Sequence, residues 1–287
     1  QDQSPIPVMI DYEPAGIHRE VVEFAKTRGQ SGHIVRSNCY SFLNRRNLDS
    51  DFGHLTDGTW WGGFQHGMGL LGMTAPITQW RNADKVLIAT QNDASLNAPW
   101  GWSQKMNNLV KWATVVCRHD GYEQTRQQKI ANVIGRHIAK TNEFPLLMVC
   151  NSYARIKDQY NCSRCTKCAQ AIVGLLIADI DPRQCGFEVT EKTFSWIKEC
   201  LDTAAFFTRK SGYWAWEDCH RSLRNRRSRG EHNIGGEHNI DGVTNFLKWF
   251  AALNLTYENN FNNISVMRDR PGYKLERHKD TYRLAVE

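Results

Sequence analysis

The chain has 287 residues, a hydrophobic fraction of 41% and a charged fraction of 23%, which is typical of a globular protein with a substantial core. No run of about 18 apolar residues occurs, and the first residues lack the basic and apolar regions of a secretory signal. We therefore expect a cytoplasmic protein that does not enter a membrane. The formal net charge of +6 is compatible with a polyanionic ligand, and equally with solubility alone.

The N-terminal part of the chain alternates short apolar runs with helical patterns. Residues 6–12 predict a buried strand, 16–28 a helix, and 32–37 a second strand, an order that indicates a β-α-β unit. A long helix that contains several glycines is expected over 64–80, and a further strand over 85–90.

The middle of the chain continues this alternation. A strand is expected over 114–118, an amphipathic helix over 123–140 and a short strand over 145–150. The alternation predicts an α/β fold with a mostly parallel sheet, which binds ligands at the C-terminal ends of its strands. We place this domain at 1–187 and a mainly helical C-terminal region at 188–287. The helices of that region are expected over 190–207, 213–227 and 242–255.

Four of the nine cysteines have the spacing of a metal site. Cys162, Cys165 and Cys168 are each separated by two residues, so consecutive tight turns can present three thiolates to one ion. Cys150, at the end of an expected strand, is the natural fourth ligand. Four thiolates close the coordination shell, which predicts a structural zinc; the alternatives are an iron–sulfur cluster or buried thiols. The apolar helix expected over 169–178 should be buried behind this site.

Several segments resemble one known family. The segments PWG at 99–101, RHDGYEQTRQQKI at 118–130 and YNCSRCTKC at 160–168, with His66-Gly67, resemble 7-cyano-7-deazaguanine synthases and uncharacterised relatives in the PP-loop ATP pyrophosphatase superfamily. The resemblance covers roughly residues 5–187. It implies a sheet of the adenine nucleotide alpha-hydrolase type that binds ATP and Mg²⁺. It also implies adenylation of a carboxylate-type substrate with release of AMP and pyrophosphate, followed by amide or nitrile formation.

One signature of that superfamily does not occur in this sequence. Its pyrophosphate loop, S-G-G-x-D-S, is not found in the 287 residues, which are expected to begin where the second strand of the fold would lie. The loop is therefore missing from this chain, supplied by another chain, or lost from the domain. The backbone N–H groups of such a loop make the tightest phosphate contacts. The alternative function is an inactive PP-loop-fold subunit that acts as a binding or scaffold protein in a complex, in nucleic-acid modification or anti-phage defence.

The segment 118–130 contains four of the candidate nucleotide-binding residues. Thr125, Arg126 and Lys129 fit the family's pattern there. Arg126 and Lys129 lie three apart on one helix face and could clamp a pyrophosphate, although a solvated basic face has the same spacing. Asp120 ends an expected strand, where a carboxylate can hold Mg²⁺ or simply form a turn or a helix cap.

Two further candidates and one basic run complete the set. Asp11 ends the first expected strand, where related folds contact adenine or ribose. His66 lies on an apolar helix, where either a ligand or core packing can account for it. The run Arg221–Arg229 can bind nucleic acid or an acidic partner, or can form a solvated loop. A protein partner or a homo-oligomer is compatible with all of these features.

Overall fold

The computed structural model of the chain falls into two compact units, Gln1–Glu123 (unit 1) and Gln124–Glu287 (unit 2), which we describe separately. None of the described helices has the length and hydrophobicity needed to cross a membrane. The structure describes residues 8–11, 25–26, 29–38, 42–55, 59–90, 93–94, 101–150, 160–203, 205–206, 210–231, 234–235, 238–255, 273–278 and 281–286.

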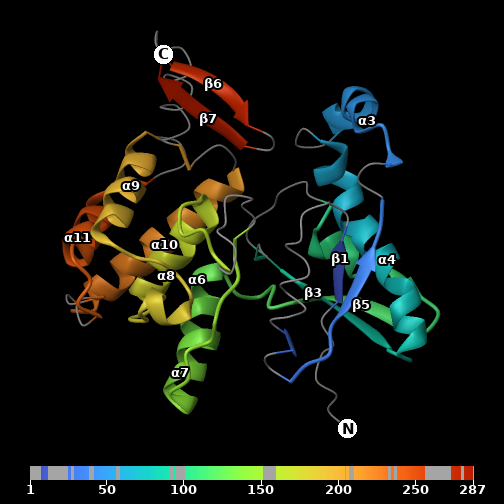
Figure 1. Cartoon of the computed structure of the whole chain (residues 1–287), viewed down its shortest axis with the longest axis horizontal. Helices are drawn as coiled ribbons and strands as arrows, with labels where there is room; N and C mark the ends of the chain where they lie inside the picture. Colours follow the sequence, from blue (N-terminus) through green and yellow to red (C-terminus); the bar gives the residue numbers. More distant parts are fainter. Residues whose placement is uncertain are drawn as a thin grey trace. The chain divides into compact units, whose positions relative to one another are not determined.

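Unit 1 contains two small sheets (Figure 1). In the first, β1 (Val8–Asp11) pairs in parallel with β2 (His33–Arg36). These strands agree with the apolar runs over 6–12 and 32–37. The helix predicted between them, over 16–28, lies almost entirely outside the described residues.

The second sheet has the strand order β3-β5-β4 and is mixed. The strands β3 (Lys85–Ala89) and β5 (Val115–Asp120) are parallel, whereas the two-residue β4 (Lys111–Trp112) is antiparallel to β5. The chain therefore combines helices with small sheets, as an α/β protein does. Among the described residues, the predicted mostly parallel sheet is represented by two separate parallel pairs.

One helix organises the core of unit 1. Helix α4 (His66–Trp80) follows a π-helical turn at Trp61–Gln65 and packs against both β1 and β3. Its Leu71 forms a small buried core with Ile88 of β3 and Cys117 of β5. The other helices in the described part of unit 1 are α3 (Arg45–Phe52), a 3₁₀ turn (Gly53–Leu55) and α5 (Gln104–Asn107).

The backbone of the first turn of α4 lies unusually close to the backbone of Gly101. A Cβ atom built on Gly67 would lie 1.9 Å from the carbonyl oxygen of Gly101. The same oxygen accepts a hydrogen bond from Asn107 Nδ2 at 3.2 Å, and the Gly101 N–H donates to Gly62 O at 2.8 Å. Glycine at position 67 is therefore needed to seat the His66-Gly67 turn against residue 101.

Unit 2 is built mainly from helices. A continuous helical stretch joins α6 (Arg126–Lys129), a π-helical segment (Ile130–Gly135) and α7 (Arg136–Thr141), in agreement with the helix expected over 123–140. The other elements that the structure describes in unit 2 are α8 (Thr166–Ile177), a 3₁₀ turn (Pro182–Cys185), α9 (Glu191–Asp202), α10 (Lys210–Ser228), α11 (Val243–Ala252), and the antiparallel hairpin of β6 (Tyr273–His278) and β7 (Thr281–Val286).

The core of unit 2 is centred on α8, which is buried from Cys168 to Ile177 as its apolar sequence predicts. Aromatic side chains from the later helices complete it. Phe206 stacks on Trp216 with ring centroids 5.2 Å apart, and Trp216 meets Phe250 edge-on at 5.9 Å. The predicted boundary between 187 and 188 therefore lies inside this unit, because residues on both sides of it contribute to one core.

Residues 145–150 do not form the strand that their apolar sequence predicts. Their backbone groups find other partners. The Leu147 N–H donates to Cys185 O at 3.0 Å, and the Val149 N–H donates to Asn161 Oδ1 at 3.1 Å. Asn161 Nδ2 donates in turn to Leu147 O at 2.7 Å. The buried Asn161 side chain thus provides hydrogen-bond partners for backbone groups of 145–150 that would otherwise pair with a neighbouring strand.

A buried histidine lies where α10 packs on α11, and we expect it to make the stability of unit 2 depend on pH. His220 is 5% exposed and meets the ring of Phe250 edge-on. Burial, followed by the nearby Arg224 cation, lowers the pKa of His220, while the backbone of Ala251 and Leu253 partly offsets this. The unfolded chain therefore takes up the proton first as pH falls. We expect stability to be lost progressively as pH falls below the unfolded value of about 6.5.

Urea titrations of the wild type and of His220→Gln across this pH range test the expectation. The loss of stability on acidification should be smaller in the variant, because glutamine carries no titrating group. An identical pH dependence in the two proteins would show that His220 does not contribute to it.

Candidate metal centre

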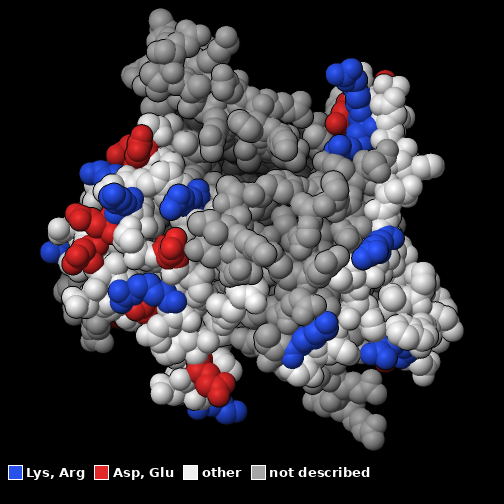
Figure 2. All heavy atoms as spheres, in the orientation of Figure 1, with Lys and Arg blue, Asp and Glu red and all other residues white. Residues whose placement is uncertain are grey.

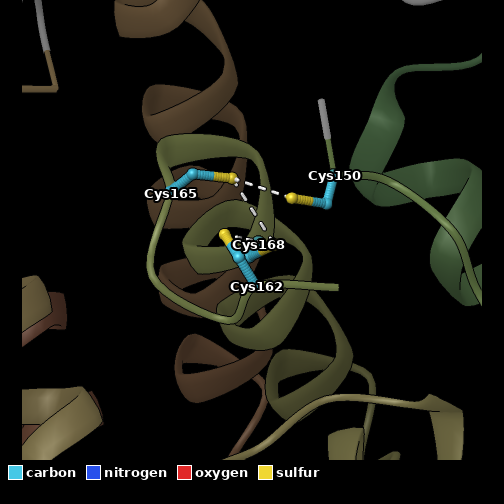
Figure 3. Close-up of side chains that lie close together, drawn as sticks. All are labelled: Cys150, Cys162, Cys165 and Cys168. Atoms are coloured by element: carbon cyan, nitrogen blue, oxygen red, sulfur yellow. Dashed lines mark hydrogen bonds between the residues drawn. The ribbon is translucent and has the colours of Figure 1, made fainter. Parts of the chain in front are cut away.

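The chain brings its four predicted ligands together around the start of α8. Cys165 is the N-cap residue of α8 and Cys168 lies in the first turn of that helix. Cys162 lies in the preceding loop, and Cys150 comes from the segment that Asn161 holds in place. Figure 3 shows the four sulfur atoms converging from these separate stretches.

The distances between the sulfur atoms suit one tetrahedral ion. All four Sγ atoms lie within 4.8 Å of one another. The Sγ atoms of Cys165 and Cys168 are 3.5 Å apart, and the pairs Cys150–Cys165 and Cys162–Cys168 are both 3.9 Å apart. A tetrahedron with zinc–sulfur bonds of about 2.3 Å has edges of about 3.8 Å. An iron–sulfur cluster distributes its cysteines over separate iron atoms, which requires wider spacing. The four cysteines can therefore hold a single metal ion such as zinc.

The protonation of the four cysteine thiols also favours a bound cation. The pKa of the Cys150 thiol lies well below its ordinary range, because the other three cysteines donate hydrogen bonds to its sulfur. The pKa of the Cys168 thiol is raised, because hydrogen bonds with Cys150, Cys162 and Cys165 favour its protonated form and burial disfavours its charge. The pKa of the Cys162 thiol is lowered to about 6, whereas that of the Cys165 thiol is raised, so two of the four thiols lose their protons readily and two do not. A bound metal ion would allow all four cysteines to be thiolates, because it would replace the remaining protons.

The loop around the ligands is fixed by backbone contacts. Ser163 has a positive φ of 52°, and its hydroxyl accepts a hydrogen bond from the Glu188 N–H at 2.9 Å. The Arg164 N–H points at Cys162 Sγ, 3.5 Å away. Such contacts orient a sulfur ligand and reduce its negative charge. The loop thus has the features of a prearranged structural site.

A polar network continues from the metal loop to α6 and α10. The Arg126 guanidinium donates to Gln170 Oε1, and the Gln127 side chain donates to Gly174 O at 2.8 Å. The backbone N–H of Gln127 donates to the buried carboxylate of Asp218 at 3.0 Å. The helices α6, α8 and α10 are therefore tied together beside the metal loop.

Lys167 interacts electrostatically with both Arg126 of this network and the sulfur cluster. Burial lowers the pKa of its ammonium group and Arg126 lowers it further, whereas the Cys165, Cys150 and Cys168 thiols raise it. Four thiolates and one divalent ion would carry a net charge of −2. The cations of Lys167 and Arg126 are thus placed to offset that charge.

Three of the predicted nucleotide-binding residues lie in unit 1. Asp11 ends β1, and its side chain lies outside the described residues. His66 begins α4, half-buried between the rings of Trp61 and Trp102 at 5.3 and 5.2 Å. Asp120 ends β5 with an exposed side chain, at the strand terminus where the sequence placed it.

The other three lie in unit 2. Thr125 is the N-cap of α6, where its hydroxyl accepts from the Gln128 N–H at 3.1 Å and Gln128 Oε1 accepts from the Thr125 N–H at 2.9 Å. This capping box gives Thr125 a structural role. Arg126 contacts Gln170 as described above, and Lys129 is half-buried. Three of the six candidates therefore belong to unit 1 and three to unit 2.

The basic run Arg221–Arg229 is partly used inside unit 2. Arg226 forms ion pairs with Asp179 and Glu231 and also donates to Ile177 O. Arg221 pairs with Asp218 at 3.5 Å. On the face shown in Figure 2, basic and acidic side chains are interspersed over the described part of unit 2. Two of these arginines thus have internal partners, and the use of the others for nucleic acid remains a prediction.

No family model, curated protein or solved structure matches this chain. The functional inference below therefore starts from the residues and contacts of the chain itself.

Proposed function

We propose that this chain is an ATP-dependent, ligase-like enzyme of the PP-loop type with a sheet of the adenine nucleotide alpha-hydrolase kind. A substrate carboxylate would attack the α-phosphate of ATP, which forms an acyl adenylate and releases pyrophosphate. A nitrogen nucleophile would then attack the acyl carbon and release AMP, which yields an amide. A second adenylation, of the amide oxygen, and loss of AMP would give a nitrile.

The observation that carries the proposal is that the 118–130 segment of the family resemblance contacts α8, the helix that begins within the cysteine segment. Residues of the 118–130 segment pack directly on the helix that follows the metal loop. The Arg126 guanidinium reaches Gln170, and the Gln127 side chain reaches Gly174 O at 2.8 Å. The metal centre, by fixing the start of α8, would then hold Arg126 in position.

The chain's own residues suggest how the phosphates would be bound. Arginine carries five N–H donors, and the contact with Gln170 uses one of its nitrogens. The remaining donors of Arg126, with the ammonium of Lys129, would grip the pyrophosphate as it forms. Asp120 belongs to unit 1, and its role as a Mg²⁺ ligand stays a prediction from the sequence. When bound, Mg²⁺ offsets the charge on the phosphates.

A product assay tests this function. The protein is incubated with labelled ATP, Mg²⁺, candidate carboxylates and ammonia, and AMP and pyrophosphate are measured. We expect Arg126→Ala to lower AMP release by about 100-fold, because it removes charge stabilisation of the departing pyrophosphate. Arg136→Ala is the matched control, because Arg136 is an exposed arginine ten residues along the same helical stretch and should leave the rate unchanged.

Two outcomes would contradict the enzyme proposal or part of it. Equal losses in Arg126→Ala and Arg136→Ala, with unchanged melting temperatures, would remove the pyrophosphate role of Arg126. Bound metal without ATP binding or turnover in the wild type would instead favour the scaffold subunit. The sequence feature that favours this second candidate is the lack of an S-G-G-x-D-S loop among the 287 residues.

A further inference from the structure

Two of the four clustered cysteines form a C-x-x-C pair at the start of α8. Cys165 is the N-cap residue, and its carbonyl accepts a helical hydrogen bond from the Ala169 N–H at 2.9 Å. Cys168 lies three residues further on in the first turn, and the two Sγ atoms are 3.5 Å apart (Figure 3). The pairs Cys150–Cys165 and Cys162–Cys168 are wider, at 3.9 Å each. The two sulfurs of the C-x-x-C pair are therefore placed to react with each other.

The backbone geometry of this pair suits a disulfide. Residues three apart in an α-helix have Cα atoms about 5 Å apart. A disulfide needs Cα atoms about 4.4–6.8 Å apart, so the backbone at the start of α8 already satisfies this requirement. The bond can therefore form by rotation of the two side chains, and the helix does not have to move.

The four cysteines differ in their access to solvent. Cys165 is half-buried, whereas the other three members of the cluster are buried. Of these, Cys168 is 0% exposed, although it lies beside Cys165. A dissolved oxidant therefore reaches Cys165 first, and a second, protected sulfur is in contact with it. An accessible cysteine next to a resolving cysteine is the arrangement found in redox-sensitive sites.

We propose that Cys165 is a site of oxidation by hydrogen peroxide and forms a reversible disulfide with Cys168, which opens the metal centre. The Cys165 thiolate attacks one peroxide oxygen and breaks the O–O bond, which gives a sulfenic acid and a hydroxide ion. The Cys168 thiolate then attacks Cys165 Sγ, forms the S–S bond and expels a second hydroxide ion. The two sulfurs together lose two electrons, and these electrons reduce the peroxide.

The disulfide would remove two of the four metal ligands. Cys150 and Cys162 alone cannot close a tetrahedral shell, so an ion held by the cluster would be released. Cys150 would then lose its connection to α8. A disulfide between residues three apart closes a very short loop and adds little stability of its own. Oxidation should therefore destabilise unit 2. This inference requires the metal centre but does not depend on the proposed enzymatic function.

Peroxide treatment of the zinc-loaded full chain tests the proposal. Released zinc is followed with a colorimetric chelator, and disulfides are mapped by mass spectrometry of a non-reduced digest. We expect about one zinc ion to be released for each Cys165–Cys168 disulfide, and to bind again after reduction with dithiothreitol. In untreated wild type, limiting iodoacetamide should label Cys165 at least about tenfold faster than Cys168, because only Cys165 is accessible.

Two variants make the test specific. Cys165→Ser removes the accessible thiol, so peroxide should release zinc at least about tenfold more slowly. Cys200→Ala is the control, because Cys200 is half-buried on α9 outside the cluster, and this variant should respond like the wild type. Labelling and disulfide mapping in the wild type decide the question even if Cys165→Ser does not hold zinc. The proposal is overturned if peroxide forms no Cys165–Cys168 disulfide, or if Cys165 is labelled no faster than Cys168.

Discussion

Replacing Cys168 by alanine should abolish metal binding and destabilise unit 2 by at least about 3 kcal/mol. Cys168 is fully buried in the first turn of α8, and its Sγ lies 3.5 Å from that of Cys165 and 3.9 Å from that of Cys162. Its loss would open the coordination shell and release an ion held between Cys150 and α8. Thermal unfolding with and without a chelator, together with metal analysis, measures the effect.

Cys185→Ala is the matched control for this experiment. Cys185 is also 0% exposed, but it lies outside the sulfur cluster. We expect this variant to keep its metal and to lose only about 1 kcal/mol through the small cavity. A chelator should lower the melting temperature of the wild type and of Cys185→Ala, with no further effect on Cys168→Ala. Equal costs for the two variants and no response to chelator would contradict a structural metal.

Replacing Gly67 by alanine should destabilise unit 1 by about 2–3 kcal/mol. The new methyl group would lie 1.9 Å from Gly101 O and 2.7 Å from Asn107 Nδ2. Gly101 is held by hydrogen bonds at both its N–H and its carbonyl, so it cannot move aside without breaking them. Urea unfolding followed by tryptophan fluorescence measures the loss.

The same helix offers an internal control at Gly72. A Cβ atom there would meet nothing within 4 Å. Gly72→Ala should therefore stabilise unit 1 by about 0.5–1 kcal/mol, because alanine is the better helix former. If Gly67→Ala were as mild as Gly72→Ala, the close approach between α4 and residue 101 would not exist in solution.

Local patterns in the sequence were sufficient to predict several elements. The apolar runs at 32–37 and 85–90 contain β2 and β3, and the apolar stretch after Cys168 is the buried part of α8. The two-residue spacing of the cysteines predicted a set of ligands that the fold brings together. Each of these sequence patterns spans about ten residues or fewer. Over that length, side-chain periodicity and turn geometry are set by neighbouring residues.

Contacts between distant residues could not be predicted in the same way. The segment 145–150 has the composition of a strand, but its backbone is paired by Asn161 and Cys185, which lie far along the chain. The partners of Arg126 were missed for the same reason, because Gln170 is 44 residues away. The hairpin of β6 and β7 was not predicted at all. Only the three-dimensional arrangement reveals such pairings.

The metal content of the purified protein tests the central claim most directly. Elemental analysis of the wild type and of Cys168→Ala, with Cys185→Ala as control, counts the ions bound per chain. The sulfur geometry predicts one zinc ion per chain in the wild type and the control, and almost none in Cys168→Ala. Several iron atoms per chain, or a metal content that Cys168→Ala does not change, would contradict a zinc centre formed by these four cysteines.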